Sequence, residues 1–188
     1  MTKKRSQFFN FLALIFYIFS LVPPAMADNF KSNKGKFYLA GLAISDEGFV
    51  NQWYLEKIKA PDAWEITQGA SNVTVAVIDT GIDLNHPDLA SNIWVNKKEI
   101  SGNSIDDDNN GYVDDVNGWN FVENNNIPSP NLNNEYTKTA VIHGTAVAGI
   151  IAAEGNNAFA GAGISWHTKI MPLKAFNEKG ESDTALVA

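Results

Sequence analysis

Apolar residues follow two different periodicities along the chain, and their order predicts an α/β fold. Residues 52–68 carry apolar side chains at helical spacing, and Pro61 is predicted to be the first residue of a short helix that Gly69 would end. Residues 73–78 form a β-branched run that is typical of a buried parallel strand. Residues 144–153 are again helical in pattern, and residues 170–176 predict a second strand. Strands that alternate with helices in this way indicate a parallel sheet.

The remaining segments have less regular patterns. Residues 79–140 are rich in Asn, Asp, Gly and Pro, and we expect them to be mostly loop. Residues 37–44 are apolar and predict either a strand or the remnant of a pro-segment. Residues 183–188 begin a helical pattern at the end of the sequence. Because a parallel sheet buries both faces, we expect an α/β domain that is incomplete at its C-terminus.

The N-terminal residues predict a signal peptide. A basic Lys-Lys-Arg at positions 3–5 precedes an apolar run at 8–22, and Ala-Met-Ala at 25–27 fits signal peptidase. A membrane anchor is the alternative, but the run is shorter than the roughly 20 residues of a span. We therefore expect cleavage after Ala27, with the mature protein secreted to the extracellular or periplasmic space and free of the membrane.

Charge and cysteine content narrow the function classes. Removal of residues 1–27 takes away three positive charges and no negative ones, which changes the formal net charge from −7 to −10. A surface this acidic argues against nucleic-acid binding. The chain has no cysteine, so an exported protein of this kind needs a cross-link other than a disulfide. Bound calcium would supply one.

The predicted strand at 73–78 leads into Asp79-Thr80-Gly81. A carboxylate at the carboxyl end of a parallel strand lies where α/β proteins place their sites. Taken alone, the tripeptide leaves three interpretations open. It could belong to an aspartic protease, which shares one proton between two such carboxylates, to another catalytic site, or to a simple turn.

Several sequence blocks decide between these interpretations. Residues 75–83 read VAVIDTGID, residues 86–89 read HPDL, and residues 143–153 begin with His-Gly-Thr. Together with IKAPDAW at 58–64, these blocks resemble the Asp and His blocks of the subtilisin-like serine peptidases, the subtilases. An aspartic protease would not explain the His-Gly-Thr block.

The resemblance extends over residues 46–188 and implies a fold and domain organisation. The fold would be the subtilisin-like three-layer α/β fold with a mostly parallel sheet. Residues 46–188 would be a partial peptidase domain, and residues 28–45 a short N-terminal segment between it and the signal peptide.

The resemblance also implies part of a catalytic triad. His143, at the opening of the helix, would be the general base, and Asp79 would orient its imidazole. Ala146 stands where the family most often has a second histidine. No Gly-Thr-Ser-x-Ala block occurs in the 188 residues. We expect a serine-type endopeptidase whose nucleophilic serine lies beyond this chain; the alternative is a catalytically inactive fragment that binds calcium and peptide.

The loop from residue 106 to residue 115 is a candidate calcium site. Asp106, Asp108 and Asn110 occupy positions 1, 3 and 5 of an EF-hand-like loop, and Asp114 occupies position 9. Position 12 is Asn117 instead of the usual Glu, so a complete EF-hand is not expected. The alternative is a solvated acidic loop without a metal.

A second calcium site is implied by the family resemblance alone. In the subtilases an N-terminal acidic residue, the Asp of His-Pro-Asp-Leu and an Asn after the His helix bind one ion. The matching residues are Asp46, Asp88 and Asn157.

The resemblance further implies where substrate binds. Gly180, Glu181 and Ser182 match the edge segment that pairs with an extended peptide, and Glu181 would favour basic side chains. The expected partners are therefore a protein or peptide substrate and a C-terminal half of the peptidase domain.

Overall fold

The structure, a computed structural model, divides into two units, Met1–Ala43 and Ile44–Ala188. It describes residues 32–33, 36–37, 44–132 and 138–183. In the first unit, strands β1 (Ser32–Asn33) and β2 (Lys36–Phe37) pair antiparallel. The predicted signal peptide lies outside the described residues, as does nearly all of the helical pattern at the end of the chain.

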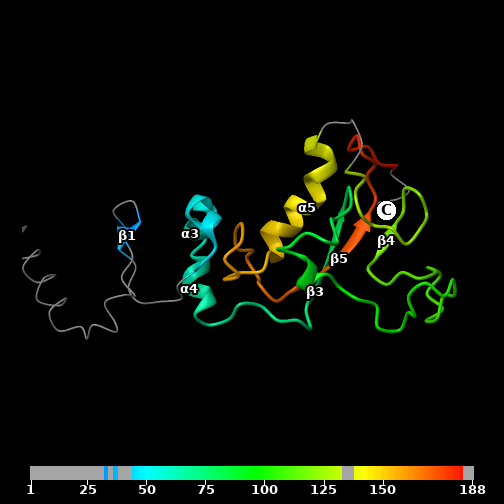
Figure 1. The fold of residues 1–188 in the computed structure, drawn as a ribbon, viewed down its shortest axis with the longest axis horizontal. Coiled ribbons are helices and arrows are strands. Elements are labelled where there is room, and N and C mark those ends of the chain that lie inside the picture. Colours follow the sequence, from blue (N-terminus) through cyan, green and yellow to red (C-terminus); the bar gives the residue numbers. More distant parts are fainter. Residues whose placement is uncertain (1–31, 34–35, 38–43, 133–137, 184–188) are drawn as a thin grey trace, which may run out of the picture. The chain divides into compact units, whose positions relative to one another are not determined.

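The second unit contains a parallel sheet, which confirms the predicted α/β class (Figure 1). Its strands are β3 (Thr74–Asp79), β4 (Trp119–Asn120) and β5 (Lys169–Lys174). Their spatial order is β3-β5-β4, and both pairings are parallel. The β3–β5 register runs from Thr74 opposite Lys169 to Asp79 opposite Lys174. Asp79 is therefore at the carboxyl end of its strand, as the sequence predicts.

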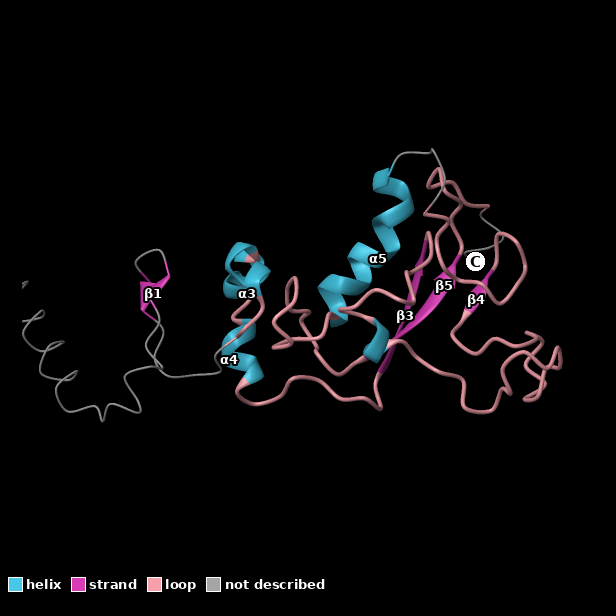
Figure 2. Cartoon of the chain, viewed as in Figure 1, coloured by secondary structure: helices cyan, strands magenta, loops and turns pink. Residues whose placement is uncertain are grey.

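Helix α5 (Lys138–Ala152) lies between β4 and β5 in the chain and packs against the sheet (Figure 2). Ala148 and Ala152 of this helix are completely buried against a cluster that includes Val77 and Ile170. Short side chains allow the helix backbone to approach the strands closely, so the position of α5 is fixed by packing.

Helix α5 begins earlier than its sequence pattern indicates. The pattern predicts a helix that opens at His143, whereas the helix starts at Lys138 and His143 lies inside it. Val141 explains part of the extension, because its side chain is 3% exposed and anchors the first turn. A helical backbone on both sides holds His143 more firmly than a helix terminus would.

The helical pattern at residues 52–68 forms short helices instead of a continuous one. Helix η1 (Glu47–Asn51) precedes this region, which contains α3 (Trp53–Lys57) and α4 (Ala60–Trp64). The break falls at Lys59, which has a left-handed backbone with φ of 58°. Pro61 is the second residue of α4 and not the first, and the helix ends at Trp64, before Gly69. Trp64 ends α4 and packs on Trp166, with ring centroids 4.8 Å apart.

The expectation that β3 is buried on both faces is wrong for the described residues. Thr74, Ala76 and Ile78 share one face of the strand and all three are exposed, Ile78 to 49%, because no described element covers that face. The segment predicted as loop also contains a short helix, η2 (Ala90–Asn92), and β4. Isolated two- and three-residue elements carry too little periodicity to be found from sequence.

We expect the β3–β5–α5 core to carry much of the stability of the second unit. Ile170→Ala removes a side chain with 0% exposure and should lower the free energy of unfolding by about 2–5 kcal/mol. Urea denaturation of the full chain measures the change. Ile66→Ala, at a side chain that is 88% exposed, is the matched control and should change it by less than about 0.5 kcal/mol. Equal effects of the two substitutions would contradict this packing.

Candidate active site

Asp79 is fixed at the end of β3 by hydrogen bonds to its backbone and side chain. Its carbonyl oxygen accepts from the amides of Ala175 at 2.9 Å and Phe176 at 3.1 Å. Its Oδ1 accepts from the amide of Thr80 at 2.7 Å and from Thr80 Oγ1 at 3.1 Å. The side chain is only 14% exposed. These contacts hold the carboxylate in one orientation, toward α5.

His143 faces this carboxylate across 64 residues of sequence. Its Nδ1 lies 2.9 Å from Oδ1 and 2.8 Å from Oδ2 of Asp79. An ionised carboxylate can only accept hydrogen bonds, so the proton is on Nδ1 and Nε2 of the neutral ring is left as an acceptor. The side chain is 61% exposed, so a reacting group can reach it. The arrangement is a base oriented by a carboxylate.

A close approach of α5 to the loop after β3 makes this contact possible. The amide of Gly144 donates to Thr80 Oγ1 at 3.2 Å, and Thr145 Oγ1 accepts from the amide of Asp83 at 3.0 Å. A Cβ atom on Gly144 would collide with the carbonyl oxygen of Gly81. Any larger residue at position 144 would therefore push His143 away from Asp79. The bridging role of Thr80 has no signal in the sequence beyond its place next to Asp79.

The predicted substrate segment lies in the loop that follows β5. Ser182 Oγ donates to the carbonyl oxygen of Ala175 at 2.6 Å, and the carbonyl of Glu181 accepts from the amide of Asn177 at 2.9 Å. Gly180 approaches Ala140 of α5: a Cβ atom at Gly180 would lie 3.8 Å from that of Ala140. Gly180, Glu181 and Ser182 are all exposed. The segment is thus accessible and lies near the start of the helix that carries His143.

The acidic loop gathers three carboxylates. Glu99, Asp106 and Asp108 each offer an oxygen, and these oxygens all lie within 4.8 Å of one another. Glu99 is 9% exposed. Oδ1 of Asp108 is buried and has no hydrogen-bond partner. Three carboxylates this close together, one with a buried and unpaired oxygen, are a donor set that suits a hard cation.

This group differs from the ligand set predicted from sequence. Asp106 and Asp108 come together, but Asp114 turns its carboxylate to the backbone amides of residues 102–104 at 2.8–3.2 Å. The side-chain amide of Asn110 donates to Asp115 at 3.0 Å. Glu99 was missed because it lies outside the loop that the EF-hand spacing covers.

The second predicted ligand set is brought together between the N-terminal end of the unit and the loop after α5. Both oxygens of Asp46 accept backbone amides of residues 156–158 at 2.6–3.1 Å. The side-chain amide of Asn157 donates to Asp88 Oδ1 at 2.7 Å. Asp46 and Asp88 are each 3% exposed.

Electrostatics at this second set are unfavourable for two carboxylates. Burial raises the pKa of Asp88 above its ordinary value, the hydrogen bond from Asn157 lowers it, and the nearby charge of Asp46 raises it again. Two buried like charges repel one another, and a cation between them would remove that cost.

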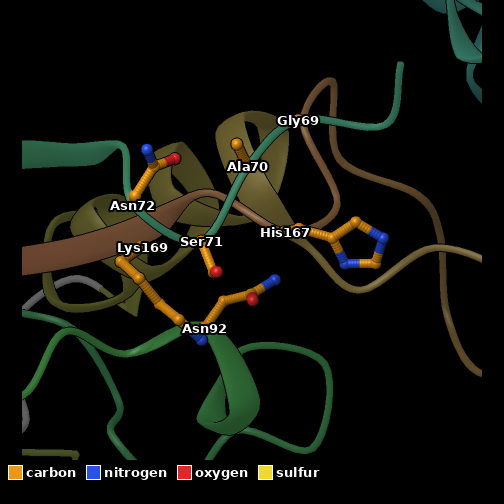
Figure 3. A pocket seen from close by; sticks show the side chains of 7 residues that line it. All are labelled: Gly69, Ala70, Ser71, Asn72, Asn92, His167 and Lys169. Atoms are coloured by element: carbon orange, nitrogen blue, oxygen red, sulfur yellow. The ribbon is translucent and has the colours of Figure 1, made fainter. Parts of the chain in front are cut away.

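A pocket of about 420 Å³ lies elsewhere in the unit (Figure 3). It is lined by residues 69–72, which precede β3, together with Asn92, His167 and Lys169. Lys169 begins β5 opposite the first residue of β3, whereas Asp79 is the last residue of β3. The pocket is therefore at the other end of the strand pair and is not part of the Asp79–His143 site.

Known proteins of similar sequence belong to the same class of enzyme as this site suggests. A family model described as "Subtilase family" matches residues 70–188. Subtilisin-like protease 1 of Plasmodium berghei is 38% identical over 155 residues, which are 81% of this chain and 24% of that protein. Thermitase of Thermoactinomyces vulgaris is 33% identical over 73% of this chain and 38% of that protein.

A solved structure gives the same result for the fold. A protease from Pseudoalteromonas arctica is 30% identical, with a TM-score of 0.52, and the match covers 78% of this chain and 42% of that one. The chain spans between 20% and 24% of the length of the Plasmodium relatives it matches. Since the family model covers more than half of the chain, and the Asp79 and His143 blocks lie within it, the chain belongs to the subtilase family.

Proposed function

We propose that this chain supplies the acid–base part of a serine-type endopeptidase. The contact of His143 Nδ1 with both carboxylate oxygens of Asp79, at 2.8–2.9 Å, is the observation that carries the proposal. It sets the imidazole tautomer in which the exposed Nε2 is free to accept a proton. The nucleophilic serine would come from outside these 188 residues.

In this mechanism His143 acts twice. Nε2 first accepts the proton of the serine hydroxyl as that oxygen attacks the peptide carbonyl carbon. The same nitrogen then donates the proton to the leaving amine when the peptide bond breaks. Asp79 stays ionised throughout and stabilises the imidazolium that forms between the two steps.

The substrate would be an extended peptide that pairs with residues 180–182. The exposure of this segment and its place beside the start of α5 support the proposal. Pairing along the peptide backbone gives affinity with little dependence on sequence. Glu181 is exposed and would favour a basic side chain in the substrate.

A second candidate function is a catalytically inactive module that binds calcium and peptide. The observations that favour it are the three close carboxylates of Glu99, Asp106 and Asp108 and the exposed segment at residues 180–182. Under this proposal the segment at 180–182 and the acidic sites keep their binding roles, but no bond is cleaved.

For the endopeptidase, a C-terminal half is the partner we propose. Ile142, Ala146 and Ile150 share one exposed face of α5, and Ile78 is exposed on β3. A helix and a strand supplied by the partner would cover these apolar surfaces. The protein would be exported, as the N-terminal pattern of residues 1–27 indicates. Within the described ranges, no helix has the length and apolar character of a membrane span.

We also propose structural calcium at two places. The first would be held by Glu99, Asp106 and Asp108, because the buried Asp108 Oδ1 has no other partner. The second would be held near Asp88 and Asp46, where two buried carboxylates lie beside Asn157. At both places calcium would neutralise carboxylates. At the second it would also join segments that are distant in sequence, the role that disulfides have in other exported proteins.

The chain by itself should not hydrolyse casein, because the covalent step needs the serine of a Gly-Thr-Ser-x-Ala block, which does not occur in these 188 residues. Release of labelled peptides from casein by the purified chain measures this. Turnover by the wild-type chain that His143→Ala abolishes would contradict the requirement for an external serine.

The proposed tautomer of His143 can be measured directly on this chain. In ¹⁵N NMR at a pH where the ring is neutral, Nδ1 should carry the proton and Nε2 should not. Asp79→Asn should remove this preference, because the acceptor carboxylate is lost. His167, whose side chain is exposed, is the internal reference and should not change. A His143 ring that is protonated on Nε2 in the wild type would rule out its role as the base.

Calcium should raise the melting temperature of the chain, and an excess of chelator should lower it, since a ligand of the folded state stabilises that state. Glu99→Gln should weaken calcium binding roughly tenfold or more, equivalent to about 1.4 kcal/mol. Glu65→Gln, at an exposed carboxylate away from both sites, is the matched control. A melting temperature that is unchanged by chelator would count against both sites.

A further inference from the structure

A buried ion pair lies at the end of β5. Lys174 is the last residue of this strand, and its side chain is 3% exposed. Its Nζ lies 2.8 Å from Oε1 of Glu178, whose side chain is 17% exposed. Charges are costly to bury unless they are paired, so this pair is a strong geometric constraint.

The Lys174–Glu178 pair lies between β3, which ends at Asp79, and the proposed substrate segment at residues 180–182. In the sheet register Lys174 is directly opposite Asp79. The next two residues, Ala175 and Phe176, donate their amides to the carbonyl oxygen of Asp79. Glu178 lies in the loop that then leads to residues 180–182. The ion pair thus joins the strand beside Asp79 to the turn that carries the segment.

The loop itself is closed by local hydrogen bonds. Asn177 Oδ1 accepts from the amide of Glu181 at 3.0 Å, and the carbonyl of Asn177 accepts from the amide of Gly180 at 2.9 Å. These bonds set the shape of the turn. Two contacts tie the turn to the sheet: Ser182 Oγ donates to the carbonyl of Ala175 at the end of the segment, and Lys174 in the strand contacts Glu178 in the middle of the turn.

The contact with Lys174 favours the ionised form of Glu178. The hydrogen bond from Lys174 holds the pKa of Glu178 below its ordinary value, and burial opposes this only in part. The carboxylate is therefore ionised at neutral pH.

We propose that the Lys174–Glu178 ion pair is a positioning device that orients residues 180–182 for pairing with an extended peptide. The inference rests on the proposed function of this segment in substrate binding. Lys174 touches neither the substrate nor the reacting atoms, and it acts through the loop.

Hydrogen exchange of the full chain tests the positioning. Lys174→Met should speed exchange of the amides of Asn177, Gly180 and Glu181 by about tenfold or more, with less than about twofold change in the interior of α5. Lys174→Arg keeps the cation and should restore slow exchange in the loop. Lys57→Met, at an exposed lysine, is the matched control and should leave the loop unchanged.

A double variant separates the orientation of the loop from the stability of the whole fold. Lys174→Met with Glu178→Met removes both charges, and this replacement commonly leaves a fold as stable as before. We expect the α5 amides to stay protected in this variant while the loop still exchanges fast. Slow loop exchange in the double variant would overturn the proposal, as would equal acceleration of the loop and α5 in Lys174→Met.

Binding of fluorescein-labelled casein to the chain tests whether the orientation of the loop affects substrate binding. Its affinity for the chain should fall roughly fivefold or more in Lys174→Met and recover in Lys174→Arg. Unchanged affinity with a mobile loop would overturn the role in substrate pairing. A wild-type chain that binds no casein would instead refute the proposed peptide site, and the exchange pattern would still decide whether the ion pair orients the loop.

Discussion

The contact between His143 and Asp79 depends on how closely helix α5 approaches the carboxyl end of β3. Gly144 allows that approach because it has no side chain, and its amide is bound by Thr80, the neighbour of Asp79. Further along α5, completely buried Ala148 and Ala152 hold the helix against the strands. The Asp79–His143 contact therefore follows from backbone proximity, which the small residues of the helix allow.

Negative charge is the second constraint on this molecule. The chain carries 21 acidic residues against 14 basic ones and no cysteine, and several of its carboxylates are buried in groups. Where a carboxylate has a cation, as Glu178 has Lys174, it ties a loop to the sheet. Where carboxylates face one another, as in the acidic loop and beside Asp88, calcium is the counter-charge we propose. Ionic cross-links would then do in this protein what disulfides do in others.

The sequence predicted the elements that have strong periodicity or a clear motif. The parallel strands, the helix between them and the place of Asp79 at a strand end all followed from such patterns. The early start of α5 and the break at Lys59 did not, since each depends on packing or on a local backbone conformation. Glu99 was missed because its approach to Asp106 and Asp108 is a matter of loop folding, and the turn of Asp114 toward backbone amides has the same origin.

The central claim is that Asp79 and His143 serve a nucleophilic serine encoded beyond residue 188. Sequencing the encoding DNA downstream of codon 188 tests this most directly. The account predicts a Gly-Thr-Ser-x-Ala block in the same reading frame, which would complete the triad. A block that follows a stop codon or a frameshift would favour the inactive calcium- and peptide-binding module. The lack of any such block would contradict the catalytic role of the pair.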